Sequence, residues 1–117
     1  MAESNYREDH KTVMDALLLD MPGVKGGKAF GYPAYKINGK IFAFVGGSGI
    51  AMKLPADRVR EVVESLPYAK PFEVAEGIVW KEWVSLDHED SDSFRDDVEL
   101  LEEAAQYVAA QYAADKS

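Results

Sequence analysis

The dipeptide Asn38-Gly39 constrains the fold of this chain more than any other local feature. It lies between two runs that are rich in apolar and aromatic residues. Asn-Gly tolerates the positive φ angles that a type I′ turn needs at both central positions, and such a turn joins two antiparallel strands. We therefore predict a β-hairpin with arms at about residues 30–37 and 40–45.

The turn also predicts a register for the strands beyond it. A two-residue loop sets three cross-strand pairs: Ile37 with Lys40, Tyr35 with Phe42, and Pro33 with Phe44. A glycine-rich turn at 46–49 leads to a third strand over 50–54, with Val45 opposite Ile50. The three strands form an antiparallel meander.

This register divides the meander into two faces. The first face is nearly all apolar, with Lys36 as the exception, and we expect helices to cover it: Tyr32, Ala34, Ile41, Ala43, Val45, Ile50, Met52 and Leu54. The second face is aromatic and basic, and we expect it to be open: Tyr35, Lys40, Phe42, Phe44 and Lys53. An exposed aromatic patch usually marks an interaction surface. The alternatives are that the last helix wraps over it or that a second copy covers it.

Apolar residues at three- and four-residue spacing predict three helices, over 8–21, 55–66 and about 90–114. Asp90, Ser91 and Ser93 are candidate N-caps of the last helix. Its predicted buried stripe is Phe94, Val98, Leu101, Ala105, Val108 and Tyr112. Between the second and third helices we predict a loop at 67–71 and two strands at 72–74 and 78–86.

The predicted order is therefore α-β-β-β-α-β-β-α. This order indicates a two-layer α+β fold, with an antiparallel sheet and helices on one face. A chain of 117 residues fits one domain, residues 1–117. No internal repeat or low-complexity tract interrupts it.

Composition narrows the functional classes. The absence of cysteine excludes a disulfide framework and thiolate catalysis. The N-terminal residues lack the pattern of a signal peptide and no apolar run reaches the length of a membrane span, so we expect a cytoplasmic protein. The net charge of −8 argues against direct nucleic-acid binding, which requires neutralisation of phosphates.

The charges are unevenly distributed along the chain. Residues 22–60 contain seven bases and one acid, whereas residues 87–103 contain nine acids and one base. We interpret them as two solvated faces of opposite sign. The alternative is a polar interaction surface that steers its partner by charge.

Three features of the sequence are candidate sites of chemistry. The segment Gly23–Lys28 has neither the spacing, the Ser/Thr nor the following helix of a phosphate loop. The acidic run around His88, Asp87–Asp90, lacks the glycine and closing glutamate of an EF-hand, so we predict helix capping there, with a metal site as the alternative. The serines lack a recognisable base partner, so we predict neither catalytic nor metal-binding residues, and no cofactor.

Five motifs in sequence order resemble the TfoX N-terminal domain family. The family pattern is a Phe-Gly opening, a hairpin ending in Gly-Lys-hydrophobic-Phe-Ala, a Lys-Leu-Pro step, Pro-Phe, and a Lys-aromatic-aromatic-Val strand. The corresponding residues are Phe30-Gly31, Gly39-Lys40-Ile41-Phe42-Ala43, Lys53-Leu54-Pro55, Pro71-Phe72 and Lys81-Glu82-Trp83-Val84. The resemblance covers about residues 10 to 112. The related YjbR/MmcQ-like domains, which share the fold, are the alternative.

The resemblance implies a two-layer α+β sandwich like that of secretion chaperones. It also implies a regulatory or adaptor role, because TfoX proteins resemble activators of competence genes that work through other transcription factors. The family supplies no catalytic residues to carry over.

Two functional hypotheses follow from the sequence. The first is a non-enzymatic binding or adaptor module that contacts an acidic protein partner, or a second copy, through Tyr35, Lys40, Phe42 and Lys53. The second is a small-molecule binder or small enzyme that uses a Lys40/Lys53 pocket for an anionic ligand. We favour the first because no nucleophile–base pair or metal set is recognisable.

Overall fold

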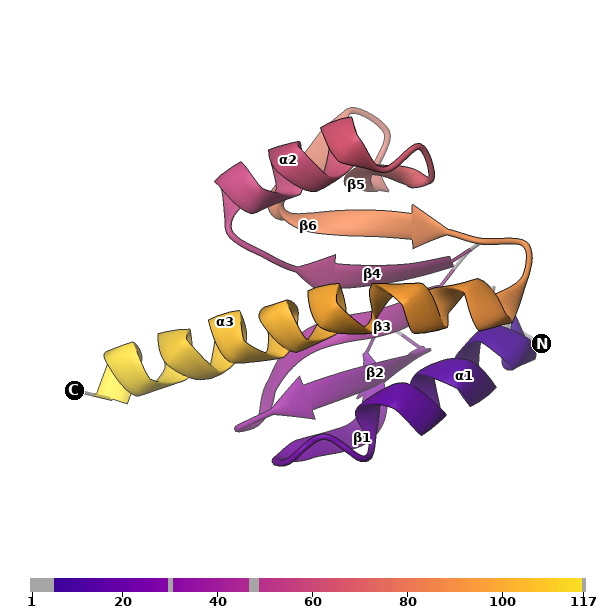
Figure 1. The fold of residues 1–117 in the computed structure, drawn as a ribbon. Helices are drawn as coiled ribbons and strands as arrows, with labels where there is room; N and C mark the ends of the chain where they lie inside the picture. Colours follow the sequence, from indigo (N-terminus) through magenta and orange to yellow (C-terminus); the bar gives the residue numbers. More distant parts are fainter. Residues whose placement is uncertain (1–5, 30, 47–48, 117) are drawn as a thin grey trace.

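The computed structural model describes residues 6–29, 31–46 and 49–116, apart from the side chains of 74–75 and 112–116. Its centre is a six-stranded antiparallel sheet with the spatial order β1-β2-β3-β4-β6-β5 (Figure 1). The strands are β1 Val24–Ala29, β2 Tyr32–Ile37, β3 Lys40–Gly46, β4 Gly49–Lys53, β5 Ala69–Ala75 and β6 Ile78–Asp87.

The helical elements are α1 Glu8–Leu18, α2 Ala56–Ser65, the 3₁₀ helix η1 Ser91–Asp97 and α3 Val98–Lys116. Figure 1 shows α1 and α3 crossing the part of the sheet formed by β1–β4 and α2 lying over the β5–β6 end. The predicted α+β class with an antiparallel sheet is confirmed. No helix in the described ranges is both long and apolar enough to cross a membrane.

The strand β1 is absent from the sequence-based prediction, which assigned a loop to Gly23–Lys28. In the structure Val24–Ala29 pairs with β2 over its full length, from Val24 opposite Ile37 to Ala29 opposite Tyr32. The sequence of β1, VKGGKA, contains two glycines, which weaken the strand signal because they have no side chain to pack. Pairing with β2, and not intrinsic propensity, therefore makes this segment a strand.

The hairpin turn is confirmed, whereas the register beyond it is wrong. Asn38 and Gly39 have φ angles of 54° and 77°, and Ile37 pairs with Lys40. Further along, Tyr35 pairs with Ala43 instead of Phe42, and Ala34 instead of Pro33 pairs with Phe44. Because Lys36 still pairs with Ile41, Phe42 is an extra residue in β3, which is a β-bulge.

The predicted pair of Val45 with Ile50 is confirmed, although Gly47 and Ser48 of the predicted turn lie outside the described residues, as does Phe30. The predicted loop at 67–71 is wrong in part, because β5 begins at Ala69. Proline has no N–H to donate to a strand ladder, so it occurs mainly on edge strands. Pro71 fits this rule because β5 is at the edge of the sheet. Helix α1 ends at Leu18, three residues before the predicted end.

The predicted phase of the last helix is largely confirmed. Phe94, Leu101, Ala105 and Val108 are buried, and Val98 is half-buried. Ala104, which the stripe omitted, is also buried, and the side chain of Tyr112 lies outside the described residues. The first turns are 3₁₀ and not α-helical, and Asp90 caps them by accepting a hydrogen bond from the Asp92 N–H at 3.0 Å. The predicted capping role of Asp90 is confirmed.

Gly39 offers a test of the turn, because a Cβ atom at this position would meet nothing within 4 Å. A substitution there introduces backbone strain without a steric clash. We expect Gly39→Val to lower the free energy of unfolding by more than about 1 kcal/mol, measured by urea denaturation. Gly27→Ala is the matched control, because Gly27 lies in β1 without a positive φ and should change stability little. Equal effects of the two variants would contradict the turn assignment.

Leu101 tests the packing of α3, since its side chain is fully buried in the core. We expect Leu101→Ala to cost about 2–5 kcal/mol of unfolding free energy, because the substitution leaves a cavity. The neighbouring Glu102 is exposed, so Glu102→Ala should change the same quantity by less than about 0.5 kcal/mol. Comparable losses for both variants would show that the helix phase is incorrect.

Candidate functional site

The strand register separates a covered face of the sheet from an uncovered one. Across β2, β3, β4 and β6, one row of register partners is Tyr35, Ala43, Met52 and Val84. Every member of this row is at most 1% exposed and belongs to the core under the helices. Because side chains alternate along a strand, the next row points away from the helices: Ala34, Phe44, Ala51 and Ser85.

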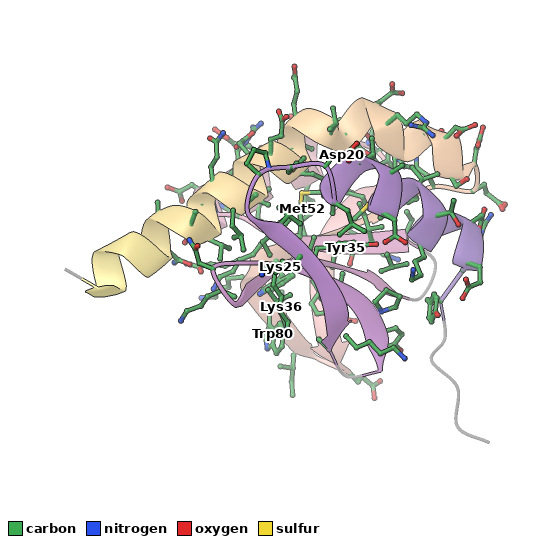
Figure 2. All side chains as sticks on the ribbon, turned by 90° about the horizontal axis from the view of Figure 1, so that it is seen from below. Asp20, Lys25, Tyr35, Lys36, Met52 and Trp80 are labelled. Carbon is green, nitrogen blue, oxygen red and sulfur yellow. The ribbon has the colours of Figure 1, made fainter. Side chains whose placement is uncertain are left out.

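Figure 2 shows the same separation. The helices lie above the sheet in this view, and Met52 lies between the sheet and the helices. Lys36 and Trp80 lie on the opposite side of the sheet. The side of the sheet that carries Phe44, Lys36 and Trp80 is called the uncovered face below.

Five aromatic side chains from four strands gather on the uncovered face: Tyr32, Phe44, Phe72, Trp80 and Trp83. Phe44 is central to this aromatic cluster, with its ring centroid 5.4 Å from those of both Phe72 and Trp83. Trp80 extends the cluster toward the tip of the β5–β6 hairpin, 5.8 Å from Phe72. The rings are half-buried except Trp80, which is exposed. The cluster is an apolar surface without a helix over it.

Lysines border the aromatic cluster on the same face. Lys25 of β1 is the direct register partner of Lys36 of β2, so two like charges face each other across neighbouring strands. Neither lysine makes an ion pair within the described ranges. Lys53 lies opposite Trp83, and its Nζ is 3.9 Å from a carboxylate oxygen of Glu82. Like charges directly opposite each other destabilise a sheet, so the Lys25–Lys36 pair is unfavourable for folding alone.

The structure does not bring the four predicted binding residues together. The expectation that Tyr35 and Phe42 lie on the open face is wrong, because the bulge at Phe42 moves both to the helix side, where they are 1% and 0% exposed. Lys40 is exposed beside the hairpin turn, and its register partner Ile37 places it on the side opposite Lys36. Only Lys53 remains on the uncovered face. The Lys40/Lys53 pocket is therefore divided between the two faces.

The buried Tyr35 has a structural role instead. Its hydroxyl donates a hydrogen bond of 2.6 Å to Asp15 Oδ1 and so ties β2 to α1. Burial, together with this hydrogen bond, raises the pKa of Tyr35 well above its ordinary value, so the phenol remains protonated.

A second polar cluster joins segments that are distant in sequence. The Asp97 carboxylate of η1 accepts hydrogen bonds from the Tyr68 hydroxyl at 2.7 Å and from His88 Nε2 at 2.9 Å. His10 Nε2 of α1 donates to the backbone carbonyl of His88 at 3.0 Å. Asp97 is 2% exposed and His10 is fully buried. The sequence pattern indicates the acidic run around His88 but not His10, Tyr68 or Asp97, because no spacing pattern links these separate segments.

This cluster holds the α1 and η1 helices on the end of the sheet. The ring of Phe94 packs edge-on against both histidines, at centroid distances of 4.9 Å to His10 and 4.7 Å to His88. Burial, with the hydrogen bond to Asp97, raises the pKa of Tyr68 to about 12. The polar groups of this cluster are therefore hydrogen-bonded to one another. Within the described residues, no group of three or more metal-ligating side chains lies close enough to hold a metal ion.

His10 gives the fold a dependence on pH. Burial, with a smaller effect from Arg7, lowers the pKa of His10 below 6.5, and His10 Nδ1 is buried without a hydrogen-bond partner among the described residues. The unfolded chain takes up a proton on His10 as the pH falls below about 6.5, whereas the folded chain resists it. This contribution to stability is present above that pH and is lost as the pH decreases.

We expect the unfolding free energy of the wild type to fall as the pH decreases from 7 to 5, with a contribution from His10 of at most about 1.4 kcal/mol per pH unit. In His10→Gln the side-chain amide can still donate to the His88 carbonyl but does not titrate. Denaturant titrations at several pH values should give a flatter profile for the variant. Parallel profiles for the two proteins would contradict this role of His10.

Comparison with known proteins does not assign the chain to a family: no family model, curated protein or solved structure matches it. The resemblance to the TfoX N-terminal domain therefore stays a prediction that rests on the five sequence motifs. The fold and the uncovered face described above are the basis for the function proposed below.

Proposed function

We propose that this protein is a non-enzymatic binding module that holds an acidic protein partner against the uncovered face of its sheet. The partner is another protein or a second copy of the chain. In place of the predicted site, the binding surface consists of the aromatic cluster and the three lysines beside it, Lys25, Lys36 and Lys53.

The aromatic cluster supports a protein partner over a small ligand. Half-buried aromatic rings provide apolar contact area at low entropic cost, and aromatic residues are enriched in protein interfaces. The rings of Phe44, Phe72 and Trp83 already contact one another in the free chain, with centroids 5.4 to 6.3 Å apart. The surface is therefore preorganised, which reduces the entropy lost on binding.

The observation that carries the proposal is the pairing of Lys25 with Lys36. Two like charges in register cost the free sheet stability, and a partner carboxylate between them would convert this repulsion into two favourable contacts. The acidic segment 87–103 of a second copy, with nine acids and one base, provides such carboxylates. An unrelated acidic protein could also provide a carboxylate between these two lysines.

The proposed role is regulatory or adaptor-like and cytoplasmic. The resemblance to the TfoX N-terminal domain supports a regulatory role that acts through other proteins. A non-enzymatic role is supported by the polar cluster of Tyr68, His88 and Asp97, in which the polar groups bond to one another.

The substitution Lys36→Glu tests how the Lys25–Lys36 pair affects stability and partner binding separately. The substitution places a carboxylate opposite Lys25, so we expect the unfolding free energy to rise by about 0.2–1 kcal/mol. The same substitution should weaken partner capture, because it reverses a charge that the partner contacts. The measurements are denaturant unfolding, sedimentation velocity for self-association, and quantitative comparison of the proteins retained from lysate by immobilised wild type and variant.

Lys28→Glu is the matched control. Lys28 lies on the same strand as Lys25 but opposite Pro33, so the new carboxylate gains no cross-strand partner. We expect it to leave capture and stability close to those of the wild type. If the Lys36 variant captures the same proteins and sediments as the wild type does, or if both variants lose capture equally, the uncovered face is not the binding surface.

A further inference from the structure

A groove of about 350 Å³ lies between α2 and the β5–β6 hairpin, apart from the polar cluster and around the end of the sheet from most of the aromatic cluster. Its lining combines apolar and charged side chains, among them Val59, Arg60, Val63, Val79, Trp80 and Lys81. Volumes of about 300–1,000 Å³ are typical of small-molecule sites, so this groove suits a small ligand.

The apolar part of the lining is unusually open to solvent. Val59 of α2 is buried, whereas Val79 and Trp80 of β6 are 44% and 39% exposed. Ile78, adjacent to them at the hairpin tip, is 55% exposed. Val79 and Trp80 line the groove, so a bound apolar group would cover part of their exposed surface.

The charged part of the lining favours an anion. Arg60 and Lys81 contribute two positive charges, and Glu64 contributes one negative charge. Arg60 is held by Asp57 one turn earlier in α2, with its side chain still 69% exposed. Lys81 makes no ion pair within the part of the chain that the structure describes, so its ammonium group is available to a ligand.

We propose that this groove binds a medium-chain carboxylate, with the hydrocarbon tail over Val63, Val79 and Trp80 and the carboxylate between Arg60 and Lys81. A peptide fits less well. Its main-chain N–H and C=O groups would lie over a lining whose only neutral polar group is the Trp80 indole N–H, and polar groups buried without hydrogen bonds cost free energy. An unbranched hydrocarbon tail has no such groups to satisfy. The site adjoins the proposed protein-binding surface at Trp80, which lines the groove and also belongs to the aromatic cluster, but its two basic residues differ from the lysines of that surface.

Trp80 makes the proposal measurable, because Trp83 is the only other tryptophan in the chain. In a Trp83→Phe protein the tryptophan fluorescence comes from Trp80 alone, which borders both the groove and the aromatic cluster, so the variants below locate the ligand. We expect dodecanoate, titrated below its micellar concentration, to change the Trp80 emission saturably. Decanoate should bind about 15-fold more weakly, because it buries two fewer methylene groups. Dodecyltrimethylammonium, with the same tail and the opposite charge, should bind at least tenfold more weakly than dodecanoate.

Variants locate the ligand. Arg60→Glu combined with Lys81→Glu should reverse the preference between the anionic and cationic amphiphiles, and Val79→Asp should weaken both. Arg95→Glu, a single charge reversal on η1 outside the groove lining, is the control and should bind as the parent does. Circular dichroism and melting temperature verify that each variant is folded.

Equal binding of the two amphiphiles, absence of a saturable response, or retention of binding in the Arg60/Lys81 double variant would overturn the proposal. Loss of dodecanoate binding in a Lys36→Glu/Lys53→Glu protein, with the Arg60/Lys81 variant unaffected, would also overturn it by placing the ligand on the uncovered face. Conversely, loss of protein capture in Lys36→Glu with intact dodecanoate binding would support separate charged contacts at the two sites.

Discussion

One extra residue in β3 determines which side chains the helices cover. Between the pair Lys36–Ile41 and the pair Tyr35–Ala43, the β3 strand contains Phe42 without a partner of its own. Because side chains alternate with a period of two, an inserted residue exchanges the two faces for every position on one side of it. The bulge thus places Phe42, Ala43 and Tyr35 together in the core.

The same exchange creates the uncovered face. With Ala43 turned toward the helices, Phe44 must point away from them, where it meets Tyr32, Phe72 and Trp83. The helix side gains a dry core, and the Tyr35–Asp15 hydrogen bond connects that core to α1. The other side keeps a half-buried aromatic surface that packs within itself. Core formation and the candidate binding surface are therefore two results of one local irregularity.

At the end of the sheet beside η1, packing depends on polar contacts instead. Asp97, Tyr68 and His88 bond within a largely buried cluster, and His10 joins it through a backbone carbonyl. Such a network requires all its members, since a buried polar group without a partner costs free energy. It fixes η1, and thereby the start of α3, against α1. The acidic residues around His88 serve this end of the fold through the cap at Asp90 and the ion pair of Asp87 with Lys70.

The sequence by itself determined the local elements: the Asn38-Gly39 turn, the apolar periodicity of the helices, and the α+β class. Each depends on neighbouring residues, whose conformational preferences and spacing can be read along the chain. Tertiary structure alone decided the rest. The strand at Val24–Ala29 exists because β2 supplies its hydrogen-bond partners, and the bulge at Phe42 exists because the core accommodates that ring. The faces of Tyr35 and Phe42, and the cluster around Asp97, follow from contacts between distant segments, which no local pattern encodes.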